Sequence, residues 1–255
     1  MPVTITTLPA RSDNYFFLLH DEESGRTALV DAPETAPIRA ALEERGWGLD
    51  EILITHHHGD HIEAVDDLRA AYGARVTGAA QDAHRLPPLD RAVSPGESFD
   101  LFGEKVEVMD APGHTVGHIA FHMPGLRALF SADSLMALGC GRLFEGSPEQ
   151  MWQTLQRLAA LPEETIVYSG HEYTAANAAF ALTIEPENPD LISREQRTRE
   201  ARAAGRATVP SALSEELATN PFLRAGVPQI KASLGMPDAS DVEAFAEIRR
   251  RKDRF

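Results

Sequence analysis

The stretch EILITHHHGDH, residues 51–61, constrains this chain most, because an apolar run leads directly into four histidines and one aspartate within six positions. EILIT is typical of a strand that is buried on both faces. Side chains of an extended backbone alternate between faces, so His56 and His58 point one way and His57 points the other. The spacing H-x-H-x-D-H at a strand end predicts a metal site, with His56 and His58 as a ligand pair.

A helix is expected next, over about 61–72. Asp60 and Glu63 resemble a capping box at its start, with the aspartate in the Ser/Thr position. Asp60 has two carboxylate oxygens, so it can cap a helix and also bind a metal. The positive end of the helix disfavours protonation of His61, and a metal ligand must be a neutral imidazole.

Three further residues follow expected strands elsewhere in the chain. His114 comes after KVEVMDA and a Pro-Gly turn, Asp133 after RALFSA, and His171 after TIVYSG. Layered α/β folds build sites in the loops at strand ends, so these side chains are candidates to complete a coordination sphere. By residue type alone, His118 and His122 compete with His114.

The character of the chain changes at about residue 173. Before it, short apolar runs bounded by turn residues read as strands: VTITT, NYFFLLH, RTALVDA, EILIT, KVEVMDA, HIAFHM, RALFSA and TIVYSG. Helical patterns over about 35–44, 61–72 and 148–160 separate them, which favours an α/β fold of two sheets between helices. After residue 173, helical segments alternate with prolines. We predict an α/β domain over 1–173 and a small helical domain over 174–255.

Composition excludes several classes of protein. A formal net charge of −15 argues against a general nucleic-acid binder or a partner of anionic membranes. The single cysteine, Cys140, allows no disulfide framework. The N-terminal segment MPVTITTLPARSDNYFF lacks the pattern of a secretion signal, and no apolar run is long enough to span a bilayer. We expect a soluble cytoplasmic protein, monomeric by default.

Several motifs together resemble the metallo-β-lactamase-fold hydrolases: THHHGDH, APGHTVGH, the strand-end Asp133 and SGHEY. Within that superfamily, four blocks resemble the glyoxalase II (hydroxyacylglutathione hydrolase) family: GCGRLFEG (139–146), YSGHEYTAANAAFA (168–181), ATNPFLR (218–224) and RRRKDRF (249–255). The resemblance covers nearly the whole chain. It implies a four-layer αββα sandwich followed by a helical substrate-binding domain.

The resemblance also implies a dinuclear site. Its first metal takes His56, His58 and His114, and its second takes Asp60, His61 and His171. Asp133 bridges both together with a water or hydroxide, while His57 and Cys140 are not ligands. Nitrogen and oxygen ligands suit two Zn²⁺ ions, with iron or manganese as alternatives.

The implied activity is hydrolysis of S-(2-hydroxyacyl)glutathione, typically S-D-lactoylglutathione, to glutathione and D-lactate, the second step of methylglyoxal detoxification. Asp60 and Asp133 are the implied catalytic residues, acting with the bridging hydroxide. Substrate contacts are assigned to Arg142, Phe144, Tyr173, Arg249 and Lys252. Phe144 replaces a tyrosine found in some members. Without the resemblance, Arg249 and Lys252 would simply complement the dipole of the last helix.

Other functions remain open at this stage. The nearest rival is a mononuclear-iron glutathione persulfide dioxygenase of the same fold. A β-lactamase is disfavoured by the lack of an export signal, and a tRNA-processing nuclease by the acidic charge. A metal-stabilised interaction module is disfavoured because structural zinc sites are closed and four-coordinate.

Overall fold

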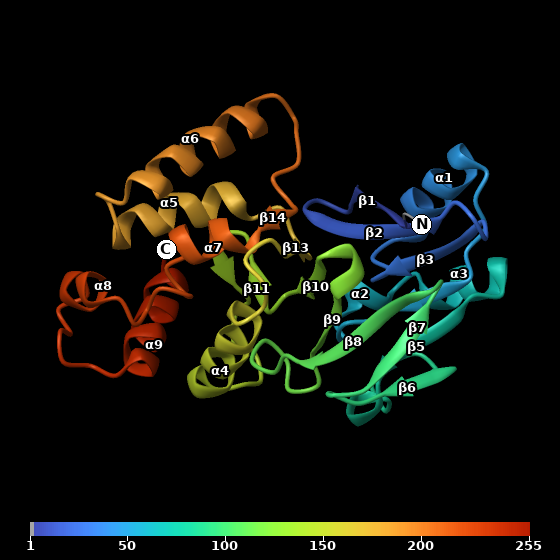
Figure 1. Ribbon diagram of the computed structural model, residues 1–255, viewed down its shortest axis with the longest axis horizontal. Helices are drawn as coiled ribbons and strands as arrows, with labels where there is room; N and C mark the ends of the chain where they lie inside the picture. Colours follow the sequence, from blue (N-terminus) through green and yellow to red (C-terminus); the bar gives the residue numbers. More distant parts are fainter. Residues whose placement is uncertain (1–2) are drawn as a thin grey trace. The chain divides into compact units, whose positions relative to one another are not determined.

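The computed structural model of the protein describes residues 3–255 (Figure 1). The chain forms two compact units. One contains the residues up to Asp110 together with Gly117–Phe130, and the other contains Ala111–Val116 together with Ser131–Phe255. The second unit thus includes a short segment, with His114, from the first half of the chain. The domain division at residue 173 stays a prediction.

The first sheet has its six strands in chain order: β1 (Val3–Ala10), β2 (Asn14–Asp21), β3 (Arg26–Val30), β4 (Glu51–Leu53), β5 (Arg75–Ala79) and β6 (Arg91–Val93). The pairs β1–β2 and β2–β3 are antiparallel, and β3 to β6 are parallel. Strands β2 and β3 form a hairpin in which Gly25 has φ 69°. All eight residues of β2 are buried, so the sheet is covered on both faces here.

Helices α1 (Thr35–Arg45) and α3 (Val65–Tyr72) pack on the first sheet, where α1 contacts β1 and α3 contacts β5. Their apolar stripes join the strands in one core cluster that includes Phe16, Leu18, Ile38, Leu42, Ile52, Val65 and Leu68. This burial follows from the helical spacing of the apolar residues.

The single helix predicted over 61–72 is wrong in one respect, because the chain forms a short α2 (Gly59–Ile62) before α3. The predicted capping box of Asp60 and Glu63 is also wrong. His58 is the extended N-cap of α2 and makes no side-chain cap hydrogen bond, so Asp60 lies inside the first turn. Asp60 instead accepts a hydrogen bond from Asn14, and Glu63 pairs with Arg11.

The second sheet has the order β14-β13-β10-β9-β8-β7. Its strands are β7 (Ser98–Leu101), β8 (Glu104–Asp110), β9 (Ile119–Met123), β10 (Ala128–Ala132), β13 (Ile166–Ser169) and β14 (Ser211–Ala212). A short 3₁₀ turn at Pro124–Leu126 connects β9 to β10, and another at Ala80–Asp82 follows β5 of the first sheet. The rings of Phe17 on β2 and Phe130 on β10 lie 5.5 Å apart. Within the first unit, the first sheet therefore packs against the part of the second sheet that this unit contains.

The second unit contains a small hairpin and most of the helices. The hairpin is β11 (Leu135–Met136) with β12 (Gly139–Cys140), and the helices are α4 (Pro148–Ala159), α5 (Thr174–Ile184), α6 (Pro189–Ala203), α7 (Leu213–Thr219), α8 (Pro228–Ser233) and α9 (Asp241–Lys252). Helix α4 packs on α9, with the rings of Trp152 and Phe245 5.9 Å apart. A capping box of Ser240 and Glu243 begins α9.

Candidate metal centre

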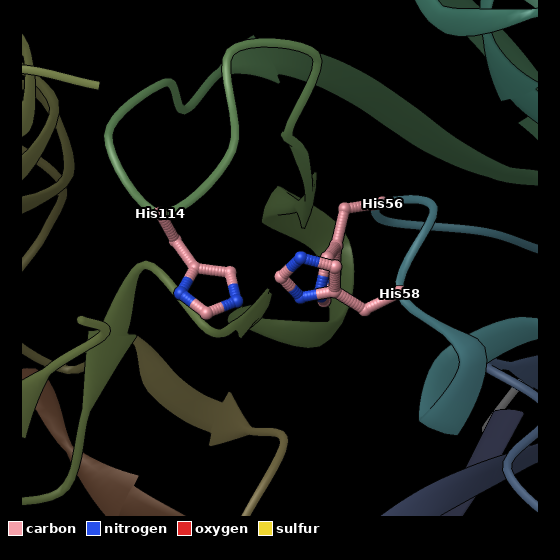
Figure 2. A group of neighbouring side chains, drawn as sticks. All are labelled: His56, His58 and His114. Atoms are coloured by element: carbon pink, nitrogen blue, oxygen red, sulfur yellow. The ribbon is translucent and has the colours of Figure 1, made fainter. Parts of the chain in front are cut away.

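The histidines that follow β4 gather with side chains from other strand ends. His56, His58 and His114 offer ring nitrogens within 4.8 Å of one another, and Figure 2 shows the three rings grouped together. Two further groups meet the same limit: His56 with His61 and Asp133, and Asp60 with His61 and His171. The seven predicted ligand residues all occur in these groups, and His57 occurs in none of them. The donor set, five imidazoles and two carboxylates, fits divalent metal ions.

His57 is held by other partners. Its Nδ1 lies 3.1 Å from Oδ2 of Asp82, and its Nε2 lies 3.4 Å from a guanidinium nitrogen of Arg85. Arg85 also donates to the Asp82 carboxylate, whose side chain is only 2% exposed. These bonds match the alternation of faces expected from the extended backbone.

Asp31, which sequence reasoning missed, orients two of the histidines. Nδ1 of His61 donates to Oδ2 of Asp31 over 2.8 Å, which leaves Nε2 as the ligand atom. The Thr55 hydroxyl also donates to Asp31, and Nδ1 of His56 lies 3.1 Å from the same hydroxyl. Since that hydroxyl already donates to a carboxylate, His56 is the donor in the second bond. Such outer hydrogen bonds fix the tautomer and ring orientation of ligand histidines.

Asn14, at the start of β2, performs the same task for Asp60. Its amide donates to Oδ2 of Asp60 over 2.9 Å and to the Asp60 carbonyl over 3.2 Å. Both bonds come from one amide nitrogen, so Asn14 fixes the backbone and the carboxylate of Asp60 together.

His114, Asp133 and His171 lie together in the second unit. Oδ2 of Asp133 lies 3.4 Å from Nε2 of His114 and 3.3 Å from Nε2 of His171. Nδ1 of His114 donates to the carbonyl of Arg142 over 2.8 Å, which leaves Nε2 as the ligand atom here too. One carboxylate oxygen close to two imidazoles is the arrangement that a bridging ligand requires.

Two aromatic side chains assigned to substrate stand beside these histidines. The ring of Phe144 meets His114 edge-on at 5.3 Å and is 62% exposed, although a ring of this kind is usually buried. Tyr173 stacks on His171 with ring centroids 4.8 Å apart. An exposed aromatic surface next to the ligands suits contact with a substrate.

The three predicted cationic contacts differ in their surroundings. Arg142 is exposed, with Nε 3.5 Å from Oδ1 of Asp253. Arg249 is buried and donates to the carbonyl of Cys140 over 3.0 Å and to Asp253 over 2.8 Å. Complementing the helix dipole therefore does not fully account for Arg249, because its main-chain partner lies outside α9.

Lys252 lies one turn beyond Arg249. Its ammonium donates to the carbonyl of Ala176 over 3.1 Å and stands 5.3 Å from the ring of Phe180. Burial, followed by the nearby charge of Arg249, lowers the pKa of Lys252 from 10.5 to about 8. This cation therefore loses its proton at a lower pH than an ordinary lysine does.

Cys140 is a free and buried cysteine. Burial raises the pKa of its thiol to about 11, so the sulfur stays protonated. A metal ligand requires the thiolate, and Cys140 is absent from the three ligand groups.

Comparison with known proteins identifies the family. The family description "Metallo-beta-lactamase superfamily" matches residues 12–171, and "Hydroxyacylglutathione hydrolase C-terminus" matches residues 172–255. The hydroxyacylglutathione hydrolases of Roseobacter denitrificans and Ruegeria pomeroyi are 62% and 60% identical to this chain, over 100% of both sequences in each case. The one from Rhizobium meliloti is 54% identical over 96% of each.

Solved structures with the same fold include ETHE1 from Myxococcus xanthus, with a TM-score of 0.69 and 25% identity over 97% of this chain and 90% of that one. Another is TTHA1623 in a di-iron-bound form, with a TM-score of 0.63 and 26% identity over 87% of this chain and 100% of that one. The predicted α/β metallo-β-lactamase fold with a helical C-terminal region is confirmed.

Among residues 3–255, no helix has the length and apolar character needed to cross a bilayer.

Proposed function

This chain belongs to the hydroxyacylglutathione hydrolase family of the metallo-β-lactamase superfamily, and on that basis we propose that it hydrolyses S-(2-hydroxyacyl)glutathione. The substrate class is typified by S-D-lactoylglutathione, and the products are glutathione and a 2-hydroxy acid such as D-lactate. The reaction is the second step of methylglyoxal detoxification. The grouping of seven nitrogen and oxygen ligands at strand ends carries the proposal, because it supplies the site that this hydrolysis needs.

We assign the ligands to two metals, as the family resemblance implies. One ion is held by His56, His58 and His114, the other by Asp60, His61 and His171, and Asp133 belongs to both. Its Oδ2 lies within 3.4 Å of ligand nitrogens from both sets, which supports the shared role. We propose Zn²⁺ as the metal, since neutral imidazoles and carboxylates suit it, while iron and manganese accept the same ligands.

Bound metal ions would lower the pKa of a water held between them and stabilise the oxyanion of the tetrahedral intermediate. The residues of the chain set the geometry of that step. Asn14 fixes the carboxylate of Asp60, which we assign to proton transfer from the attacking water. The leaving thiol of glutathione has a pKa of about 8.5, so it departs as a thiolate without a strong general acid.

Glutathione carries two carboxylates, which need cations in an otherwise acidic chain. We assign Arg249 and Lys252 on α9, together with Arg142, to these groups. Tyr173 and Phe144 then flank the acyl end, beside His171 and His114. Phe144 has no hydroxyl, so it contributes an apolar surface where some family members offer a hydrogen bond.

We further propose that the protein is a cytoplasmic monomer.

Metal analysis of the purified protein together with a thiol-release assay tests the proposal. We expect about two divalent ions per chain and release of free thiol from S-D-lactoylglutathione. A chelator should abolish the release, and added Zn²⁺ should restore it. Oxygen uptake with glutathione persulfide, a single iron per chain and no thiol release would instead identify the persulfide dioxygenase.

A further inference from the structure

The β11–β12 hairpin connects two backbone positions on which the metal ligands depend. Only Ser134 separates it from Asp133, and only Gly141 separates it from Arg142, whose carbonyl orients His114. Gly141 closes the hairpin by donating its N–H to the carbonyl of Ser134 over 3.1 Å. A Cβ on Gly141 would lie 1.9 Å from the carbonyl oxygen of Asp133, so the returning strand presses against that residue. Movement of the hairpin would therefore move Asp133.

Side chains of α7 hold the tip of this hairpin. Asn220, at the end of α7, donates its amide to the carbonyls of Met136 and Gly139 over 3.1 and 2.9 Å. Glu216 accepts the N–H of Leu138 over 2.9 Å. Leu138 has φ 56°, a left-handed conformation that non-glycine residues rarely adopt. The tight turn is thus held by hydrogen bonds to helix side chains rather than by the backbone hydrogen bonds of longer strands.

Side chains from two other helices also donate hydrogen bonds to the hairpin. Asn177 of α5 donates to the carbonyl of Ala137 over 3.0 Å, and Arg249 of α9 donates to the carbonyl of Cys140 over 3.0 Å. The four side chains from α5, α7 and α9 are all less than 8% exposed. Buried hydrogen bonds of this kind are strong and leave few alternative arrangements.

Glu216 is itself firmly fixed. Its carboxylate, fully buried, accepts from Ser211 over 2.6 Å and from Asn220 over 3.1 Å, and it pairs with the guanidinium of Arg194. A buried carboxylate with this many donors has a defined orientation, since any rotation would leave a donor unsatisfied. Because this carboxylate accepts the N–H of Leu138, its fixed orientation also fixes the position of that N–H.

We infer that Glu216 and Asn220 are positioning residues for the metal centre. They act through the β11–β12 hairpin on Asp133 and on the Arg142 carbonyl that orients His114. The inference rests on the proposed function in taking Asp133 and His114 as metal ligands. It gives the helical region a second task besides substrate binding, which is to hold one side of the coordination sphere in place.

The variant Glu216→Gln tests this inference with a readout that needs no substrate. The amide keeps the shape of the side chain but replaces one acceptor oxygen with a donor, which conflicts with the donors around it. We expect the affinity for Zn²⁺, measured by competition with a chromophoric chelator, to fall about 10-fold. In the thiol-release assay kcat should fall while KM stays unchanged, since Glu216 is not a substrate contact.

The matched control is Thr219→Val, which alters the same buried network without touching the hairpin. Thr219 accepts from Arg194 over 2.8 Å and donates to the carbonyl of Glu215 over 2.6 Å. Thr219→Val should lower the melting temperature but leave Zn²⁺ affinity at the wild-type value. If Glu216→Gln fails to fold, Asn177→Ala removes a single hairpin contact and should lower Zn²⁺ affinity in the same direction.

Wild-type Zn²⁺ affinity in every folded hairpin variant would overturn the inference, even if the melting temperatures fall. A wild-type protein that binds two metals but releases no thiol would refute the proposed function and leave this metal-binding test intact. The two failures are therefore distinguishable.

Discussion

Asp31 lies directly behind His61, with 2.8 Å between its Oδ2 and Nδ1 of the imidazole, and the same carboxylate reaches His56 through the hydroxyl of Thr55. His56 and His61 are assigned to different metals. A single buried carboxylate at the end of β3 thus orients one ligand of each ion. Asp31 has φ 57°, and its oxygens also accept the N–H of Thr55 over 2.9 Å, so the backbone on both sides is tied to it.

Asp31→Asn should weaken the binding of both metals. The amide keeps one acceptor oxygen but places a donor against either Nδ1–H of His61 or the Thr55 hydroxyl. Loss of an outer hydrogen bond of this kind lowers metal affinity by about 10- to 100-fold. Competition with a chromophoric chelator measures the change for each ion.

Asp50→Asn is the matched control, because Asp50 accepts a backbone N–H of the same sheet, that of Thr27, over 2.8 Å and contacts no ligand. It should leave both metal affinities unchanged. Equal metal affinities in Asp31→Asn and Asp50→Asn would show that Asp31 does not orient the ligands.

His57 and His58 should respond differently to replacement. His58→Ala should reduce the metal content, because His58 belongs to a ligand group. His57→Ala should leave the metal content unchanged and destabilise the fold by about 1–3 kcal/mol, since the buried Asp82 loses a hydrogen-bond partner. Elemental analysis and thermal unfolding of the two variants check this, and loss of metal from His57→Ala would contradict the assignment.

Strand alternation was enough to separate His57 from its neighbours, because that rule depends only on local backbone geometry. Asp31 was missed for the opposite reason. It ends the predicted strand RTALVDA like many polar strand-end residues, and its partner His61 lies 30 residues further along the chain. Only the parallel pairing of β3 with β4 brings the two strand ends together.

The errors at helix and strand ends have similar causes. Asp60 matched a capping pattern, yet the N-cap of α2 is His58, and Asn14 donates to the Asp60 carboxylate. Strands β5 to β7 were not predicted, because their segments are short and bounded by charged residues. The β11–β12 hairpin has two residues in each strand. The side chains that hold it come from helices far along the chain, so no single sequence window contains both the hairpin and its contacts.

Phe144→Tyr should lower KM for the glutathione thioester. Phe144 is largely exposed beside His114, so a hydroxyl at the ring end fits without repacking. One new hydrogen bond to the substrate is worth about 0.5–1.5 kcal/mol, or roughly 2- to 10-fold in KM. Steady-state kinetics with S-D-lactoylglutathione measure this, with Phe144→Leu as a control that adds no hydroxyl. An unchanged or higher KM in Phe144→Tyr would mean that the substrate offers no partner at this position.

The depressed pKa of Lys252 predicts a pH dependence of folding stability with a definite sign. The folded-state pKa of about 8 lies below the ordinary lysine value of 10.5. Between these two values the unfolded chain binds a proton that the folded protein does not. The contribution of Lys252 to the free energy of unfolding is therefore unfavourable below pH 8 and is relieved as the pH rises towards 10.5. Chemical unfolding at several pH values should show a smaller dependence on pH in Lys252→Met than in the wild type.

Substrate binding should follow the opposite trend, because only the protonated Lys252 attracts a carboxylate of glutathione. We expect KM to rise about fivefold as the pH increases through about 8, since a half-exposed ion pair is worth about 1 kcal/mol. Lys252→Arg keeps its charge over this range and should abolish the rise, while Lys252→Met should give a high KM at every pH. Initial rates of thiol release between about pH 7 and 9.5, corrected for uncatalysed hydrolysis, provide the measurement. A rise that persists unchanged in Lys252→Arg would assign the titration to another group and leave Lys252 a structural cation that binds the Ala176 carbonyl.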